Sequence, residues 1–228
     1  MFFRVLGPIE VSDTATHRGM APRSGAQRVL LAALLARPSA AVATRSLIEE
    51  LWGGAPPRCP ANALQAHVSR LRRLLQSAGP TPGHGPDLRP EGEGYALRVA
   101  LLDTDWGLFT RDVNRAAALL PDDPVTARAV LRRALGLWRG PALGGAGTGP
   151  LVTAFAEVMW TRRREAAAML RDASYQGPVG ATAGPAGDLV RLARQLDGVV
   201  AEQRRLSGAV QRLTDLVLTR VPGGGGRD

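Results

Sequence analysis

Residues 58–75 constrain this chain more than any other segment, because they encode an amphipathic helix whose two faces differ in kind. Apolar side chains recur at helical spacing on one face and predict a buried stripe: Leu64, Val68, Leu71 and Leu75. Small residues, polar side chains and arginines lie mainly on the other face: Asn62, Ala63, Ala66, His67, Ser69, Arg70 and Arg73. Small residues allow close backbone approach, and arginines reach phosphates or guanine edges. The pattern is typical of a recognition helix in a DNA major groove. An ordinary surface helix with solvated arginines is the alternative, so the flanking segments decide.

The preceding segments predict a strand and two further helices. Residues 3–11 are rich in β-forming side chains and fit a first strand, with a local break at Gly7-Pro8. Ala26–Ala36 is a strongly apolar helical run. Thr44 is a candidate N-cap for a second helix over Arg45–Trp52. Three helices therefore follow one another before residue 76.

A predicted β-hairpin follows the amphipathic helix. Gly79–Pro86 is a glycine- and proline-rich turn, and alternating side chains in Asp87–Val99 are typical of strands. Gly92 and Gly94 are candidates for the positive φ of the hairpin turn. A helix followed by a hairpin is a winged helix, so residues 1–100 are predicted to form an α+β winged helix-turn-helix.

The charge pattern points to a polyanionic partner. The formal net charge is +9, and every one of the 29 basic residues is arginine. The absence of lysine is attributed to GC-rich codon usage first, and not to a chemical requirement for arginine. No acidic residue occurs between Glu50 and Asp87, where four arginines stand unopposed: Arg58, Arg70, Arg72 and Arg73. A membrane surface is a poorer fit, because no basic helix carries a matching bulky apolar face.

A second, all-helical module is predicted to begin near Leu102–Asp105. Apolar residues between Trp106 and Leu120 recur at helical spacing. Asp123-Pro124 fits an N-cap followed by proline at the first helical position, opening a helix that runs to Trp138. Because the connection is short, these two helices must be antiparallel, as in a tetratricopeptide unit. Trp138 is expected to pack between them, although a recognition role is the alternative.

The remaining sequence predicts more helix, a linker and a tail. Leu151–Ser174 is a third long helix whose arginines 162–164 are expected to be solvated, with contact to DNA backbone or polymerase as the alternative. Residues 176–187 resemble a linker, and Asp188–Leu218 returns to helical periodicity. The predicted domains are 1–100 (winged helix), 101–220 (all-α helical repeat, shortened at its C-terminal end) and 221–228 (disordered tail).

Several of these segments resemble the Streptomyces antibiotic regulatory protein family of transcriptional activators. The segments that carry the resemblance are Phe3–Val11, Gln27–Leu35, Leu47–Gly53 with Pro56-Pro57 after it, Val68–Arg73, Gly94-Tyr95 and Ala134–Leu143. Their order matches an OmpR-type winged helix followed by a bacterial transcriptional activation domain. The resemblance implies binding of double-stranded DNA at promoter direct repeats, two protomers side by side and contact with RNA polymerase holoenzyme. It further implies regulation of secondary-metabolite biosynthesis, including antibiotic biosynthesis.

The resemblance also implies roles for individual residues. Arg70 falls at a base-reading position, and Ala63 and Ala66 fall on the groove-facing surface. Positions at or beside backbone contacts are Asn62, His67, Ser69, Arg72 and Arg73. Arg58 and Arg89 complete the candidate DNA-binding set. The chain departs from many relatives at the wing tip, where Glu91 and Glu93 accompany Arg89 instead of a further basic residue.

Catalytic and metal-dependent functions find little support. His17, His67 and His84 lie in separate segments without a carboxylate or cysteine at ligand spacing. The glycine-rich string 144–150 lacks the Lys-Ser/Thr of a P-loop, so a flexible loop is predicted. The single Cys59 excludes an internal disulfide framework. No cofactor, enzymatic activity or membrane association is expected.

The sequence favours a sequence-specific transcriptional activator in the cytoplasm, on the nucleoid, since no signal peptide or membrane span is evident. Two alternatives remain: a repressor with the same fold, and a helical-repeat protein-interaction module.

Overall fold

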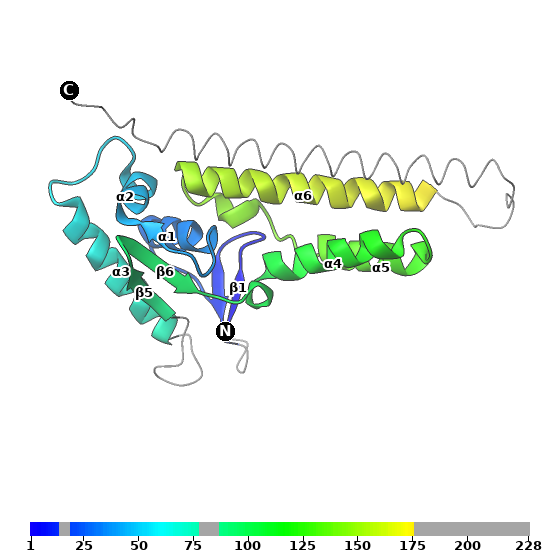
Figure 1. Cartoon of the computed structure of the whole chain (residues 1–228), viewed down its shortest axis with the longest axis horizontal. Coiled ribbons are helices and arrows are strands. Elements are labelled where there is room, and N and C mark those ends of the chain that lie inside the picture. Colours follow the sequence, from blue (N-terminus) through cyan, green and yellow to red (C-terminus); the bar gives the residue numbers. More distant parts are fainter. Residues whose placement is uncertain (14–18, 78–86, 176–228) are drawn as a thin grey trace, which may run out of the picture. The chain divides into compact units, whose positions relative to one another are not determined.

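Two three-stranded antiparallel sheets and six α-helices make up the part of the chain described by the structure, a computed structural model covering residues 1–13, 19–77 and 87–175. All of them belong to one unit, Met1–Gln176. Figure 1 shows α3 with the β5–β6 hairpin at one end of this unit and α4 and α5 toward the other, while α6 runs from beside α1 and α2 along α4 and α5. The predicted linker, the helix over 188–218 and the tail lie outside the described residues.

The N-terminal sheet is built from three short strands: β1 (Phe2–Arg4), β2 (Glu10–Ser12) and β3 (Gly19–Met20). β2 pairs antiparallel with both neighbours, and Phe3 lies opposite Val11. The prediction of one strand over residues 3–11 is therefore wrong, because the Gly7-Pro8 break reverses the chain. Gly7 has a φ of 154°, and a Cβ there would lie 2.9 Å from the Cβ of Arg139, so the turn is packed against the helical part of the chain.

The helix-turn-helix core consists of α1 (Gly25–Leu35), α2 (Thr44–Trp52) and α3 (Pro60–Ser77), close to the predicted bounds. α1 begins with a capping box, in which the Ser24 hydroxyl accepts from the Gln27 N–H and the Gln27 side chain accepts in return. The predicted Thr44 cap is wrong, since Ala43 occupies the N-cap position of α2. The Thr44 hydroxyl instead donates to the carbonyl of Glu93 at 2.7 Å, which fastens α2 to the hairpin.

The wing is the hairpin of β5 (Asp87–Glu91) and β6 (Gly94–Arg98), extended by β4 (Val42–Ala43) in the order β4-β6-β5. Gly92 has a φ of 58°, as the hairpin turn requires. Gly94 does not share this conformation. It lies so close to the Val42 carbonyl that any Cβ would overlap it, so glycine is needed there for packing.

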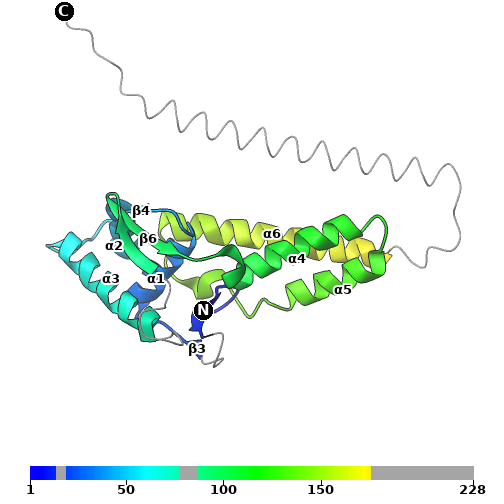
Figure 2. The same cartoon turned by 60° about the horizontal axis from the view of Figure 1, so that its bottom comes forward.

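The helical module, residues 101–175, contains η1 (Leu101–Asp103), α4 (Asp105–Leu119), α5 (Pro124–Leu135), η2 (Ala142–Gly145) and α6 (Pro150–Tyr175). Asp123 caps α5 as predicted, accepting from the Thr126 N–H at 2.9 Å with proline next in the chain. α4 and α5 lie antiparallel, and α6 runs beside both (Figures 1 and 2). α5 ends three residues before Trp138, so the prediction that this helix reaches Trp138 is wrong.

Trp138 packs among aromatic rings of the helical module, as expected. Its ring meets Phe109 edge-on at 5.7 Å and tilts against Trp160 at 5.3 Å. The Arg163 guanidinium lies 4.8 Å from the Trp138 ring centroid, a cation–π contact. Arg162 forms an ion pair with Glu165. The prediction that arginines 162–164 are simply solvated is therefore wrong for two of the three.

Apolar residues from the whole described chain form a single buried cluster. It joins the winged-helix module, defined as the described residues up to 100, to the helical module. The glycine-rich string 144–150 lies at this junction, with Gly144 against Pro8 and Gly147 against Val29, so the prediction of a flexible loop is wrong. The domain boundaries at 1–100, 101–220 and 221–228 stay a prediction.

Candidate nucleic-acid interface

Helix α3 has the two faces that its sequence predicts. Its four buried residues are those of the predicted apolar stripe: Leu64, Val68, Leu71 and Leu75. The opposite side is exposed at Asn62, Ala66, Ser69, Arg70 and Arg73, and half-buried at Ala63. Because the stripe packs the helix against α1 and α2, its polar face is left exposed. α3 itself lies at one end of the unit (Figure 1). A rigid helix with small residues and arginines outward is suited to a groove.

Three arginines at this face have no partner within the protein. Arg58, Arg70 and Arg73 are exposed and make no hydrogen bond or ion pair in the described part of the chain. The reason is local, because no acidic residue occurs between Glu50 and Asp87 to neutralise them. Their guanidinium groups remain available for an anionic ligand.

Arg72, unlike Arg70 and Arg73, has a hydrogen-bond partner within the protein. It is half-buried, and its Nε donates to the Leu88 carbonyl of β5 at 3.0 Å. The residue thus ties the recognition helix to the wing. Sequence spacing places it beside Arg73, but only the fold shows that the wing carbonyl occupies one of its donors.

His67 lies on the flank of α3, half-buried against Trp52 of α2. The two ring centroids are 5.9 Å apart, and the His67 Nδ1 is buried without a hydrogen-bond partner. Burial, followed by the nearby positive charge of Arg70, lowers the pKa of His67 below its usual value. The His67 ring therefore joins α3 to α2 at the edge of the candidate interface.

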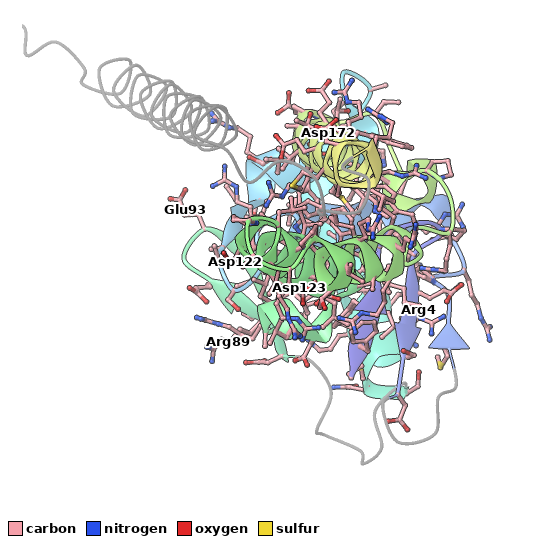
Figure 3. The ribbon with its side chains drawn as sticks, turned by 90° about the vertical axis from the view of Figure 1, so that its right-hand side faces the viewer. Arg4, Arg89, Glu93, Asp122, Asp123 and Asp172 are labelled. Carbon is pink, nitrogen blue, oxygen red and sulfur yellow. The ribbon has the colours of Figure 1, made fainter. Side chains whose placement is uncertain are left out.

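The wing carries both signs of charge. Arg89 pairs with Asp87 at 3.3 Å, and both side chains are about half exposed. Glu91 accepts from Arg98 at 2.7 Å, a side-chain pair between the two strands of the hairpin that the sequence pattern did not predict, since Arg98 lies opposite Asp87 in the register. Glu93 has no ion pair among the described residues, and its side chain projects from the wing, as does Arg89 (Figure 3). The acidic character of the tip therefore rests on Glu93.

Two kinds of structure are absent from the described ranges. Among residues 1–13, 19–77 and 87–175, no three His, Cys, Asp or Glu side chains gather as metal ligands do. Within the same ranges, no helix has both the length and the apolar character needed to cross a bilayer.

Two protein-family models match the chain in the order of its modules. The model for the C-terminal part of transcriptional regulatory proteins matches residues 22–87, which contain α1, α2 and α3. The model for the bacterial transcriptional activator domain matches residues 104–197, which contain α4, α5 and α6.

Curated relatives match over the same region. The chain is 42% identical over 145 residues to the transcriptional regulator RedD of Streptomyces coelicolor, covering 64% of this chain and 41% of the relative. It is 40% identical over 147 residues to the regulatory protein AfsR of the same species, covering 63% of this chain and 14% of the relative. The chain thus spans less than half the length of these relatives.

A solved structure has the same fold. It is Mycobacterium tuberculosis EmbR in complex with a low-affinity phosphopeptide, which superposes with a TM-score of 0.68 at 24% identity. The superposition covers 89% of this chain and 50% of the other, so it extends over both modules.

Proposed function

The chain belongs to the Streptomyces antibiotic regulatory protein family, and from this premise we propose that it is a sequence-specific DNA-binding transcriptional activator. The observation that carries the proposal is a set of three exposed arginines without a partner in the described protein: Arg70 and Arg73 on the outward face of α3, and Arg58 two residues before that helix. A solvated surface helix would more often pair such charges with acids one turn away. Between Glu50 and Asp87 the sequence contains no acidic residue that could pair with them.

We propose that α3 enters the major groove with Arg70 toward base edges. A guanidinium that forms no internal hydrogen bond can offer both donors to guanine O6 and N7. Ala63 and Ala66 permit close approach of the helix, and Arg58 and Arg73 neutralise phosphates at its two sides. Asn62 and Ser69 add uncharged hydrogen-bond donors toward the DNA backbone. The wing lies beside the groove through Arg89, and Arg72 and His67 hold the helix in position.

The further steps are proposals from family membership. Two protomers bind neighbouring direct repeats of a promoter as a dimer on DNA, and the helical module contacts RNA polymerase holoenzyme. The regulated genes belong to a secondary-metabolite pathway. The protein acts in the cytoplasm, on the nucleoid, without catalytic activity of its own.

Selection of bound sequences from a random DNA pool tests DNA recognition. We expect enrichment of a short motif in tandem copies. Arg70→Ala should lose the motif, whereas Arg115→Ala should retain it, because Arg115 is an equally charged, exposed residue of α4. Failure of the wild-type protein to enrich any motif would contradict sequence-specific binding and favour the helical-repeat interaction module.

Transcription in vitro from a promoter that carries the selected repeats then separates activator from repressor. An increase in transcript that requires the intact helical module supports activation. A decrease on the same template would identify a repressor with the same fold.

A further inference from the structure

A buried carboxylate of the winged-helix module lies at the start of the longest helix of the helical module. Glu50 belongs to α2 and is 5% exposed. Its Oε1 accepts from the Leu151 N–H at 2.5 Å, and its Oε2 accepts from the Val152 N–H at 3.3 Å. The first N–H groups of a helix have no intrahelical acceptor and carry the positive end of the helix dipole. Glu50 thus caps the N-terminus of α6, although it lies about one hundred positions earlier in the chain.

The glycine before this helix is required by the same contact. A Cβ on Gly149 would lie 2.8 Å from the Cα of Glu50 and would overlap its carboxylate. The φ of Gly149 is outside the left-handed region, so backbone conformation alone does not call for glycine. Glycine is required there because α2 approaches the backbone of residue 149 so closely. Any side chain at position 149 would push α2 and α6 apart.

A second buried carboxylate crosses the junction in the opposite direction. Asp105, at the start of α4, accepts from the Val5 N–H at 2.7 Å and from the Leu6 N–H at 3.2 Å. Burial raises the pKa of Asp105, although these two N–H groups and the Arg139 guanidinium act the other way. Each module therefore contributes one carboxylate that accepts hydrogen bonds from backbone N–H groups of the other module. One such contact lies near β1 and the other at α2.

The hydrogen bonds between Glu50 and α6 lie close to a contact between α2 and the recognition helix α3. Glu50 and Trp52 are both on α2, and Trp52 packs on His67 of α3. Contacts therefore continue from the N-terminus of α6, through Glu50 and α2, to α3. Movement of α2 relative to α6 would change the direction in which α3 points from the helical module.

We propose that Glu50 is a positioning residue that fixes the helix-turn-helix on α6, so that the recognition helix and the helical module keep one relative orientation. The rigid junction is a property of the single chain. Its consequence for DNA rests on the proposed function: two protomers on neighbouring repeats can support each other only when the repeat spacing suits that fixed orientation.

Distance measurement between two spin labels tests the junction directly. Cys59 is the single cysteine of the chain and is exposed just before α3. A second label is attached through Ala129→Cys, since Ala129 is exposed on α5. The wild-type full-length chain should give a narrow distance distribution. Glu50→Ala and Gly149→Ala should each broaden or shift it, and Glu49→Ala, an exposed acid on the same helix, should leave it unchanged.

Glu50→Gln provides a gentler variant if Glu50→Ala unfolds the protein. Glutamine keeps the shape and one acceptor but presents an NH₂ group to the second N–H, so the cap is half lost. Broadening with Glu50→Gln at unchanged circular dichroism supports a positioning role. A distribution as narrow as wild type in Glu50→Gln and Gly149→Ala alike would overturn it.

DNA with two copies of the selected repeat supplies the functional readout. Insertion of half a helical turn, about 5 base pairs, rotates the second site to the opposite face of the duplex. Wild-type protein should lose about tenfold or more in affinity on this insertion. Glu50→Gln should lose much less while its affinity for one repeat stays the same, and Glu49→Gln should behave like wild type. Equal spacing dependence in Glu50→Gln and wild type would refute the inference. If wild type binds no DNA, the proposed function fails and the spin-label result still decides whether Glu50 fixes the junction.

Discussion

Two arginines of α3 and three arginines of the helical module differ in whether the fold supplies them with an acidic partner. Arg70 and Arg73 are exposed and unpaired within the described chain. In the helical module, Arg111 and Arg133 share the buried Asp112 at 2.9 and 3.0 Å, and Arg139 reaches Glu10 at 3.0 Å. The positive charge of the helical module is therefore partly neutralised inside the fold, whereas that of α3 is left for a ligand. Net charge alone does not distinguish these uses.

The largest effect is expected when a paired arginine is removed. Arg139→Ala takes away the hydrogen bond to the Pro8 carbonyl and the positive charge 3.7 Å from buried Asp105. We expect the free energy of unfolding to fall by about 2–3 kcal/mol, since Arg139 is partly exposed and a fully buried pair would lose more. Urea denaturation measures it. Arg115→Ala, which also removes an exposed charge, should stay within about 0.5 kcal/mol, and an equal loss there would end the distinction.

Arg70→Ala should show the reverse profile. Because Arg70 has no internal partner, the free energy of unfolding should change by less than about 0.5 kcal/mol. Affinity for the selected sequence should fall by about 1–3 kcal/mol, with a smaller loss on random DNA. Fluorescence anisotropy on both duplexes measures this. Equal losses on the two duplexes would mean that Arg70 contacts only the backbone.

Arg72 and Arg73 are adjacent in sequence but are expected to differ in salt dependence. Arg73→Ala should reduce the slope of log K against log salt by about 0.9, the value for one phosphate contact. Arg72→Ala should change this slope less, because its Nε is bonded to the Leu88 carbonyl, and should mainly loosen the wing. A titration from low to high salt compares the two variants. Identical slopes would place both side chains on phosphates.

The wing tip offers a comparison of two glutamates. Glu93→Arg should tighten binding to random DNA at low salt, with a gain that shrinks as salt rises. Glu91→Arg should give a smaller gain, because Glu91 already pairs with Arg98 and the substitution leaves two arginines facing each other. If neither substitution changes affinity at low salt, the wing tip is held away from DNA.

His67 should give the smallest effect, visible as a dependence of stability on pH. The folded-state pKa of His67 is lowered, so below about 6.5 the unfolded state binds the proton more tightly than the folded state does. The stability contributed by neutral His67 is present above that pH and is lost as pH falls through the lowered pKa. Urea denaturation of wild type and His67→Leu at about pH 7.5 and about pH 5.5 should show a steeper loss for wild type. Parallel losses would mean that His67 titrates as it does in the unfolded chain.

The recognition helix and its two faces could be predicted from the sequence because the information is local. The hydrophobic spacing, the absence of acidic residues from 51 to 86 and the cap at Asp123 are each visible in one continuous segment of the sequence. The same holds for the order of helices in both modules. The error at Thr44 came from a distant partner: Thr44 is a good N-cap by composition, but the carbonyl of Glu93, 49 residues further along the chain, offers its hydroxyl another acceptor.

The candidate site was only partly accessible from sequence. The ten predicted DNA-binding residues share one segment and the wing, but spacing could not separate Arg72, which bonds to β5, from Arg73, which bonds to nothing in the described chain. Glu91 likewise is an unpaired acid by sequence, and only the fold shows that the Arg98 side chain of the neighbouring strand donates to it, although Arg98 lies opposite Asp87 in the register.

The sequence by itself determined which residues form helices, which helix faces are buried and where positive charge is left unopposed, since periodicity and local charge are properties of short segments. Tertiary structure alone decided how the two modules join. Glu50 and Leu151, like Asp105 and Val5, are about one hundred residues apart, and nothing near either carboxylate announces a distant N–H partner. Gly144, Gly147 and Gly149 resemble a flexible loop by sequence for the same reason, because the atoms that require their small size belong to the turn between β1 and β2, to α1 and to α2. A close approach between distant segments is a property of the folded chain and has no local signal.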